Sequence, residues 1–278
     1  MKYEIKKIEN GLIRITFPDE RHYYHEPSDS YLPSATWVCN YWHKDDYLIK
    51  WIAKHGWDDA EMIKKSKGNR GTRVHNAIEY LIGKKEIKID QKFYNEPTDT
   101  QEELTADEWE CVMSFQAWYE KTQPEILEVE TPIFVLPSKD FEYGYAGTID
   151  LICKINGELW IVDLKTSADV HKTHILQQSA YKNALNKDIK LGILQVGYAR
   201  NKNKYKFTEI PDRIDLFKLA YSTWDEEVSS KYPRQKDYPI KIKLNGKHEK
   251  IKVTKASKNS RANLRDSTKR RHTPKGRA

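Results

Sequence analysis

The dipeptide Asn156-Gly157 constrains the fold of this 278-residue chain more than any other feature. It separates two runs in which apolar and polar residues alternate, 145–155 and 158–167. An Asn-Gly pair between alternating runs favours a β-hairpin with a two-residue turn. A turn of this length fixes which residues of the two strands face each other.

Extended along both strands, this register places Asp150 opposite Asp163. Facing residues share one side of a sheet, so the two carboxylates are expected to point the same way. Lys165 follows two residues later and is expected on that side as well. On the reverse side the register predicts apolar pairs, including Ile149 with Leu164.

Two facing carboxylates in a mostly apolar sheet repel each other and need a neutralising group. A divalent cation meets this need, because Mg²⁺ and Mn²⁺ prefer carboxylate oxygens as ligands. Such a site could bind a phosphate oxygen and acidify a water molecule. The alternative is a buried ion pair between Asp163 and Lys165, with the second acid reaching solvent. The hairpin alone leaves both interpretations open.

The rest of the chain predicts an α/β domain on a mixed sheet. Thr105 and Glu108 have the spacing of a helix capping box, whereas Gly68 and Gly71 predict a break between helices. Further helices are expected at 45–55, 57–66, 71–83, 105–121, 170–186 and 212–230, further strands at 126–135, 191–200 and 204–210, a charged connector at 84–104, and hairpins around Asn10-Gly11 and at 240–253.

Charge is distributed unevenly along the chain. Residues 241–278 contain 14 Lys and Arg against 2 Asp and Glu, whereas the preceding residues carry a net negative charge. A basic tail on an acidic body favours a polyanionic partner, most often a nucleic acid, the alternative being a solubilising or disordered end. The three cysteines form no CxxC pair, and no apolar run approaches the length of a membrane helix, so we expect a cytoplasmic protein without membrane contact.

Four motifs, in order, resemble the PD-(D/E)XK nuclease superfamily in its RecB-like exonuclease branch. The 145–167 hairpin resembles the superfamily core, in which an aspartate strand precedes a D/E-x-K strand. GTRVH at 71–75 resembles the Gly-x-x-x-His helix of the branch, and QQSAY at 177–181 resembles its Gln-x-x-x-Tyr helix. LPSATWV at 32–38 is similar to a segment of phage exonucleases and the mitochondrial genome maintenance exonuclease.

The resemblance implies a restriction-endonuclease-like core, in which helices flank a central mixed β-sheet, here followed by the C-terminal hairpin and basic tail. It also implies roles for individual residues. The metal ligands would be His75, Asp150, Asp163 and the backbone carbonyl of Leu164. Lys165 would orient or deprotonate the attacking water and stabilise the transition state. The remaining residues near the scissile phosphate would be Gln177, Tyr181 and Glu130.

We therefore expect a Mg²⁺- or Mn²⁺-dependent exonuclease that acts on single-stranded DNA ends in recombination, repair or replication. The alternatives are a structure-specific endonuclease and a DNA-binding module that does not cleave. No GxxxxGK[ST] nucleotide-binding loop is present in the sequence, so a helicase or recombination protein would be a separate chain. The expected setting is the cytoplasm of a bacterial or phage-infected host. The expected parts are an N-terminal hairpin and lead-in at 1–30, a nuclease domain at 31–235, a hairpin at 236–253 and a basic tail at 254–278.

Overall fold

The computed structural model describes residues 4–7, 11–16, 21–44 and 46–228. The chain divides into two compact units, of which one is Leu32–Ser229 and the other contains Met1–Tyr31. The hairpin and basic tail expected beyond residue 235 lie outside the described residues, so both stay predictions.

The unit that contains the N-terminus is built on a sheet with strand order β1-β2-β3-β4. Its first two strands pair antiparallel, in agreement with the hairpin expected around Asn10-Gly11. The elements are β1 (Glu4–Lys7), β2 (Leu12–Thr16), β3 (Arg21–His25), the short 3-10 helix η1 (Glu26–Ser28) and β4 (Ser30–Pro33).

The larger unit contains the expected mixed sheet, with strand order β11-β10-β9-β8-β7. Neighbouring strands are antiparallel except β9 and β10, which are parallel and are connected through helix α5. The strands are β7 (Glu125–Val135), β8 (Tyr145–Ile155), β9 (Glu158–Lys165), β10 (Lys190–Val196) and β11 (Tyr205–Ile210). The helices are α1 (Ala35–Cys39), α2 (Asp46–His55), α3 (Trp57–Lys84), α4 (Ala106–Thr122), α5 (Lys172–Leu185) and α6 (Ile214–Glu227).

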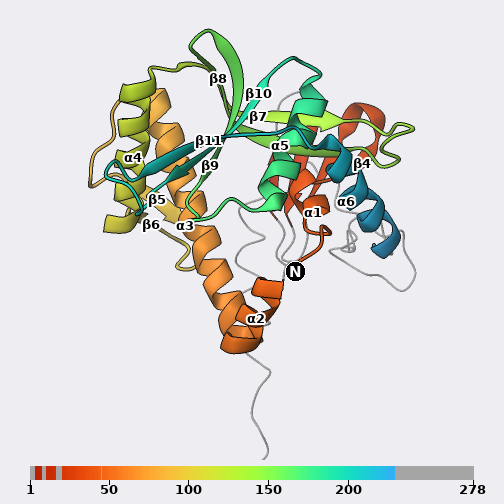
Figure 1. Cartoon of the computed structure of the whole chain (residues 1–278), viewed down its shortest axis with the longest axis horizontal. Coiled ribbons are helices and arrows are strands. Elements are labelled where there is room, and N and C mark those ends of the chain that lie inside the picture. The colour runs from red at the N-terminus through yellow and green to blue at the C-terminus, as the bar shows by residue number, and fades with distance from the viewer. Residues whose placement is uncertain (1–3, 8–10, 17–20, 45, 229–278) are drawn as a thin grey trace, which may run out of the picture. The chain divides into compact units, whose positions relative to one another are not determined.

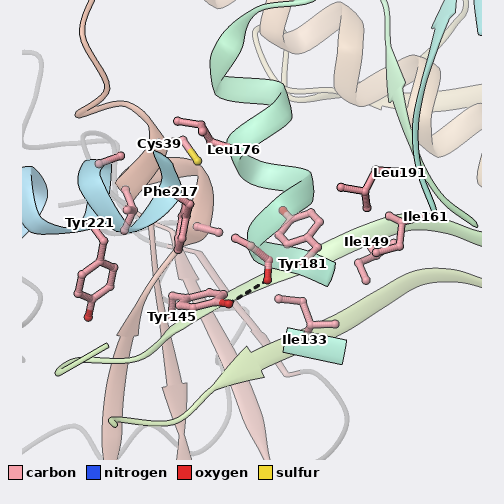
Figure 2. Close-up of a cluster of buried hydrophobic side chains, with 14 of the residues drawn as sticks. Cys39, Ile133, Tyr145, Ile149, Ile161, Leu176, Tyr181, Leu191, Phe217 and Tyr221 are labelled. Atoms are coloured by element: carbon pink, nitrogen blue, oxygen red, sulfur yellow. Dashed lines mark hydrogen bonds between the residues drawn. The ribbon is translucent and has the colours of Figure 1, made fainter. Parts of the chain in front are cut away.

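Helices cover both faces of this sheet (Figure 1). Residues of α1, α5 and α6 share one buried apolar cluster with one face of the strands, including Ile149, Ile161 and Tyr181. Figure 2 shows this cluster, in which the Tyr145 hydroxyl donates to the Ala180 carbonyl at 2.9 Å. Residues of α3 and α4 share a second cluster with the other face, including Leu151. The expected core with a helix-flanked mixed sheet is therefore confirmed.

Helix α3 differs from expectation, because it continues from Trp57 to Lys84 without a break at Gly68 or Gly71. Its second half is anchored by the buried side chains of Val74, Ala77 and Ile78, and this packing outweighs the weak helix propensity of glycine. The helix ends at Lys84, and the next residue, Lys85, adopts the left-handed conformation with φ of 63°.

The charged connector between α3 and α4 contains a hairpin that the sequence did not predict, β5 (Lys92–Asn95) and β6 (Thr100–Glu103). The predicted capping box of α4 is present, since Thr105 and Glu108 exchange both of its hydrogen bonds. Glu108 also accepts a hydrogen bond from the buried Arg73 guanidinium at 2.9 Å, which ties α3 to the start of α4. No helix in the described part of the chain combines the length and the apolar character needed to cross a bilayer.

Candidate metal and active site

The β8–β9 hairpin has the expected two-residue turn, but its strands separate earlier than expected. The paired residues run from Ile155 with Glu158 to Leu151 with Val162. Beyond that point the carboxylate of Asp150 accepts the backbone N–H of Leu164 at 2.7 Å. A side chain thus accepts the hydrogen bond that a backbone carbonyl would accept in a regular ladder, and Asp150 is not paired with Asp163.

The alternation of side chains between the two faces of the sheet is interrupted in strand β8 at Asp150. Ile149 packs in the cluster under α5, whereas Leu151 packs in the cluster under α3 and α4. Residues two apart on a regular strand share one face, so the alternation is reset between them. Leu164 also packs on the α3 side, and the predicted pairing of Ile149 with Leu164 is therefore wrong.

In the neighbouring strand β7 the alternation of side chains is interrupted opposite Asp150. Val129 packs on the α3 side and Ile133 on the α5 side, although residues four apart normally share a face. Glu130 lies between them with φ of 51°, a left-handed conformation that is uncommon for a non-glycine residue. Its neighbours pair with the neighbours of Asp150, so the two irregular positions are adjacent. Irregular backbone of this kind re-aims a side chain and occurs often at functional sites.

These irregularities bring an imidazole and two carboxylates together. His75, Glu130 and Asp150 each offer one potential ligand atom, and the three atoms lie within 4.8 Å of one another. His75 comes from the middle of α3, and its Nδ1 lies 3.6 Å from Asp150 Oδ1. Its Nε2 lies 2.9 Å from the Leu164 carbonyl oxygen, which can only accept. Metal-binding histidines commonly donate one ring N–H to such a carbonyl and bind the ion through the other nitrogen, so these residues fit a divalent cation.

Asp163 lies beside this group and not within it. The Asp163 side chain is 3% exposed, and its Oδ2 lies 2.6 Å from the ammonium nitrogen of Lys165. Burial raises the pKa of Asp163, and the Asp150 charge reinforces the shift while Lys165 opposes it. Burial alone would lower the pKa of Lys165, but the charges of Asp163 and Asp150 outweigh burial and raise it. The site therefore holds two acids that share the same nearby cations.

Protonation of His75 is coupled to Asp150. Burial disfavours the imidazolium, but the Asp150 carboxylate outweighs burial and raises the pKa of His75 above its usual value. Burial likewise favours the neutral form of Asp150, but the charge and hydrogen bond of His75 prevail, and the pKa of Asp150 is lowered. Without metal, the two residues therefore stabilise each other as an ion pair.

This coupling predicts a pH dependence of stability in EDTA. A raised pKa stabilises the fold below the unfolded value of about 6.5, and the stabilisation is lost as the pH rises through the folded pKa. The free energy of unfolding, measured by urea titration from about pH 6 to pH 9, should therefore fall more steeply for the wild type than for His75→Gln. The exposed His43 provides the control, His43→Gln, which should keep the wild-type slope. Equal slopes for wild type and His75→Gln would contradict the coupling.

Gln177 and Tyr181 form a hydrogen-bonded pair on α5. The Gln177 amide donates to the Tyr181 hydroxyl at 2.7 Å and lies 3.2 Å from the Thr36 hydroxyl. Tyr181 packs against β8 at Gly147, where a Cβ would lie 2.4 Å from its ring. The structure thus joins the 177–181 motif to the 32–38 motif, against the strand that carries Asp150.

Two residues outside the predicted set hold the loop that follows Lys165. Gln195, buried and opposite Lys165 in the ladder, donates to the carbonyls of Ser167 and Ala168 at 3.0 and 2.8 Å. Arg70 donates to the carbonyl of Thr166 at 3.3 Å. No local motif marks these residues, because their role depends on the parallel pairing of β9 and β10.

The mixed sheet flanked by helices defines a restriction-endonuclease-like fold. Asp150 on β8, Asp163-x-Lys165 on β9 and His75 on α3 give it a site of the kind that binds a divalent metal ion. A family model of the PD-(D/E)XK nuclease superfamily matches residues 49–251, most of the chain, and the chain belongs to this superfamily. The family consists of nucleases, hydrolases that use divalent metal ions. No curated protein matches the chain. Among solved structures, the crystal structure of SSO0001 is similar, at 14% sequence identity and a TM-score of 0.30, over 58% of this chain and 75% of that chain.

Proposed function

We propose that this chain is a metal-dependent DNA exonuclease of the RecB-like branch that acts on single-stranded ends. The observation that carries the proposal is the group His75, Glu130 and Asp150 beside the ion pair of Asp163 with Lys165. An ion pair alone would account for Asp163 and Lys165, but it gives no reason for a second and third acidic group at the same place. Paired acids with perturbed pKa values in one site are more typical of function than of structure.

His75, Glu130 and Asp150 would hold Mg²⁺ or Mn²⁺, with Asp163 at hand as a further oxygen ligand. The Leu164 carbonyl, a ligand expected from the sequence, would instead accept from His75 Nε2 and orient the imidazole. A bound ion of this kind polarises a phosphate oxygen and lowers the pKa of a water molecule. The imidazole of His75 is a softer ligand than oxygen and favours Mn²⁺ as a supporting metal. Compared with the set expected from the sequence, Glu130 joins the ligands and Asp163 lies at their edge.

The proposed role of Lys165 is to stabilise charge. Its raised pKa keeps the ammonium protonated at neutral pH, so it is poorly suited to remove a proton from water. A protonated group at this position can bind a non-bridging phosphate oxygen and the negative charge that develops there. Gln177 and Tyr181, fixed by their mutual hydrogen bond, would form the wall of the site on the α5 side.

The test is cleavage of end-labelled DNA with Mg²⁺, Mn²⁺ or EDTA. We expect short products from linear single strands, resistance of circular single strands, and no cleavage in EDTA. Cleavage of circles would favour a structure-specific endonuclease. Binding without cleavage of any substrate would favour a non-catalytic module. We also propose a cytoplasmic role in recombination, repair or replication, with any helicase or recombination protein as a separate chain.

A further inference from the structure

The first half of α3 exposes most of its side chains. Among the residues of α3 that precede Arg73, a single one, Ala60, is buried. In Figure 1, α2 and the first turns of α3 extend away from the sheet, whereas the second half of α3 lies beside α4. The composition of this stretch is therefore not explained by the packing of the described core.

Positive charge gathers on this stretch, next to the site. Lys64, Lys65 and Lys67 are exposed, and the sequence has no acidic residue from 62 to 78. Glu61 contacts the Lys64 ammonium at 3.2 Å, but this pair is largely solvent-exposed and holds Lys64 only weakly. The lysines are therefore available to bind an external anion.

Helical geometry directs this charge to the metal site. Residues 64, 68, 71 and 75 are spaced by three or four positions and lie along one side of a helix. The row leads from Lys64 over Gly68 and Gly71 to His75, a distance of about 16 Å along the axis. Lys65 and Lys67 flank the row on its two sides. We call Lys64, Lys65, Lys67, Gly68 and Gly71 the cationic face of α3.

Gly68 is not required by the packing of the described chain. A Cβ built at this position meets no atom within 4 Å, and its backbone is helical. Glycine is less favourable than alanine inside a helix, so the residue weakens α3 without relieving a clash. A bare helix surface between lysines does, however, allow an extended polyanion to approach the helix closely.

We propose that the cationic face of α3 binds the sugar–phosphate backbone of single-stranded DNA and leads the strand to His75. This inference rests on the proposed function, whose substrate it describes. The argument for a nucleic acid is charge complementarity together with continuity with the site. A polyanion bound at the lysines lies on the same side of the helix that supplies His75, with Thr166 beside the row at Gly71. Contacts to phosphates carry affinity and position, and they do not read sequence.

The test compares two triple variants of the full chain with equal charge loss. One is Lys64→Gln/Lys65→Gln/Lys67→Gln. The control replaces three exposed lysines elsewhere in the chain, in Lys121→Gln/Lys139→Gln/Lys187→Gln. Binding of a fluorescent 20-nucleotide oligothymidylate is measured in EDTA over a range of salt concentrations. The α3 variant should bind at least about 10-fold more weakly, and the slope of log affinity against log salt should flatten by about 2. Equal affinities for the two triple variants would overturn the proposal.

Gly68→Ala provides a second test that does not change charge. The added methyl group should leave the melting temperature unchanged or higher, while the affinity for the oligonucleotide falls severalfold. Full affinity in this variant would show that no strand approaches Gly68 closely and would overturn the proposed path along the row.

A small phosphodiester separates this proposal from the proposed function. Bis(p-nitrophenyl) phosphate with Mn²⁺ is too short to reach the lysines, so its hydrolysis should be equal in the wild type and the α3 variant. Lack of hydrolysis and of DNA cleavage in the wild type would contradict the nuclease proposal, yet weaker oligonucleotide binding by the α3 variant would still support the binding surface. Normal hydrolysis with unchanged binding would overturn the surface alone.

Discussion

Replacing Lys165 by methionine should slow DNA cleavage by about 10³-fold at saturating metal, with the fold intact. Methionine keeps much of the length and apolar contact of the side chain but removes the ammonium 2.6 Å from Asp163. The positive charge proposed to stabilise the transition state is then lost.

The cost in stability should be limited, because burial already raises the pKa of Asp163 and the acid can become neutral without its partner. Single-turnover cleavage measures the rate, and circular dichroism measures the melting temperature. Lys190→Met is the matched control, since Lys190 forms an exposed ion pair with Glu158 on the same sheet. A Lys165→Met rate within threefold of the wild type would refute a role for the ammonium in the reaction.

Mn²⁺ should raise the thermal stability of the wild type, and Asp150→Asn or Glu130→Gln should each remove most of that increase. An ion at 100 times its Kd stabilises a folded protein by about 2.7 kcal/mol. Asparagine at position 150 can still accept the Leu164 N–H, so the variant loses charge and keeps the local hydrogen bond.

The measurement is a series of thermal melts with increasing Mn²⁺. Glu128→Gln, an exposed acid on the same strand as Glu130, is the control and should keep the full effect. Asp163→Asn should lose less of the effect than Glu130→Gln, because Asp163 lies outside the group of three proposed ligands. The opposite ranking would restore the ligand set expected from the sequence, and the absence of any Mn²⁺ effect in the wild type would argue against a metal site.

Local signals predicted much of the nuclease fold. The Asn156-Gly157 turn, the capping box of Thr105 and the five strands of the central sheet depend on neighbouring residues, and all are present in the structure. The break expected around Gly68 and Gly71 was wrong, because tertiary packing of the following turns keeps α3 helical through both residues. The β5–β6 hairpin was missed because its residues are charged and lack an apolar alternation.

The site was less predictable, because it depends on departures from regular structure. A two-residue period assigns each strand residue to one face of the sheet. It does not predict that the side chains switch to the opposite face at Glu130 and Asp150. The left-handed backbone of Glu130 has no glycine or asparagine to mark it. The sequence therefore indicated acids and a lysine that lie near one another in the structure, and their arrangement came from the contacts between β7, β8 and α3.

The position of β7 at the edge of the sheet has a consequence for when the proposed metal site can form. Glu130 belongs to this outermost strand, whereas Asp150 belongs to the interior strand β8 and His75 to helix α3. A nascent or partly unfolded chain whose outer strand has not docked lacks one of the three proposed ligands and should hold its ion poorly. The proposed hydrolytic activity would then require β7 to be paired with β8.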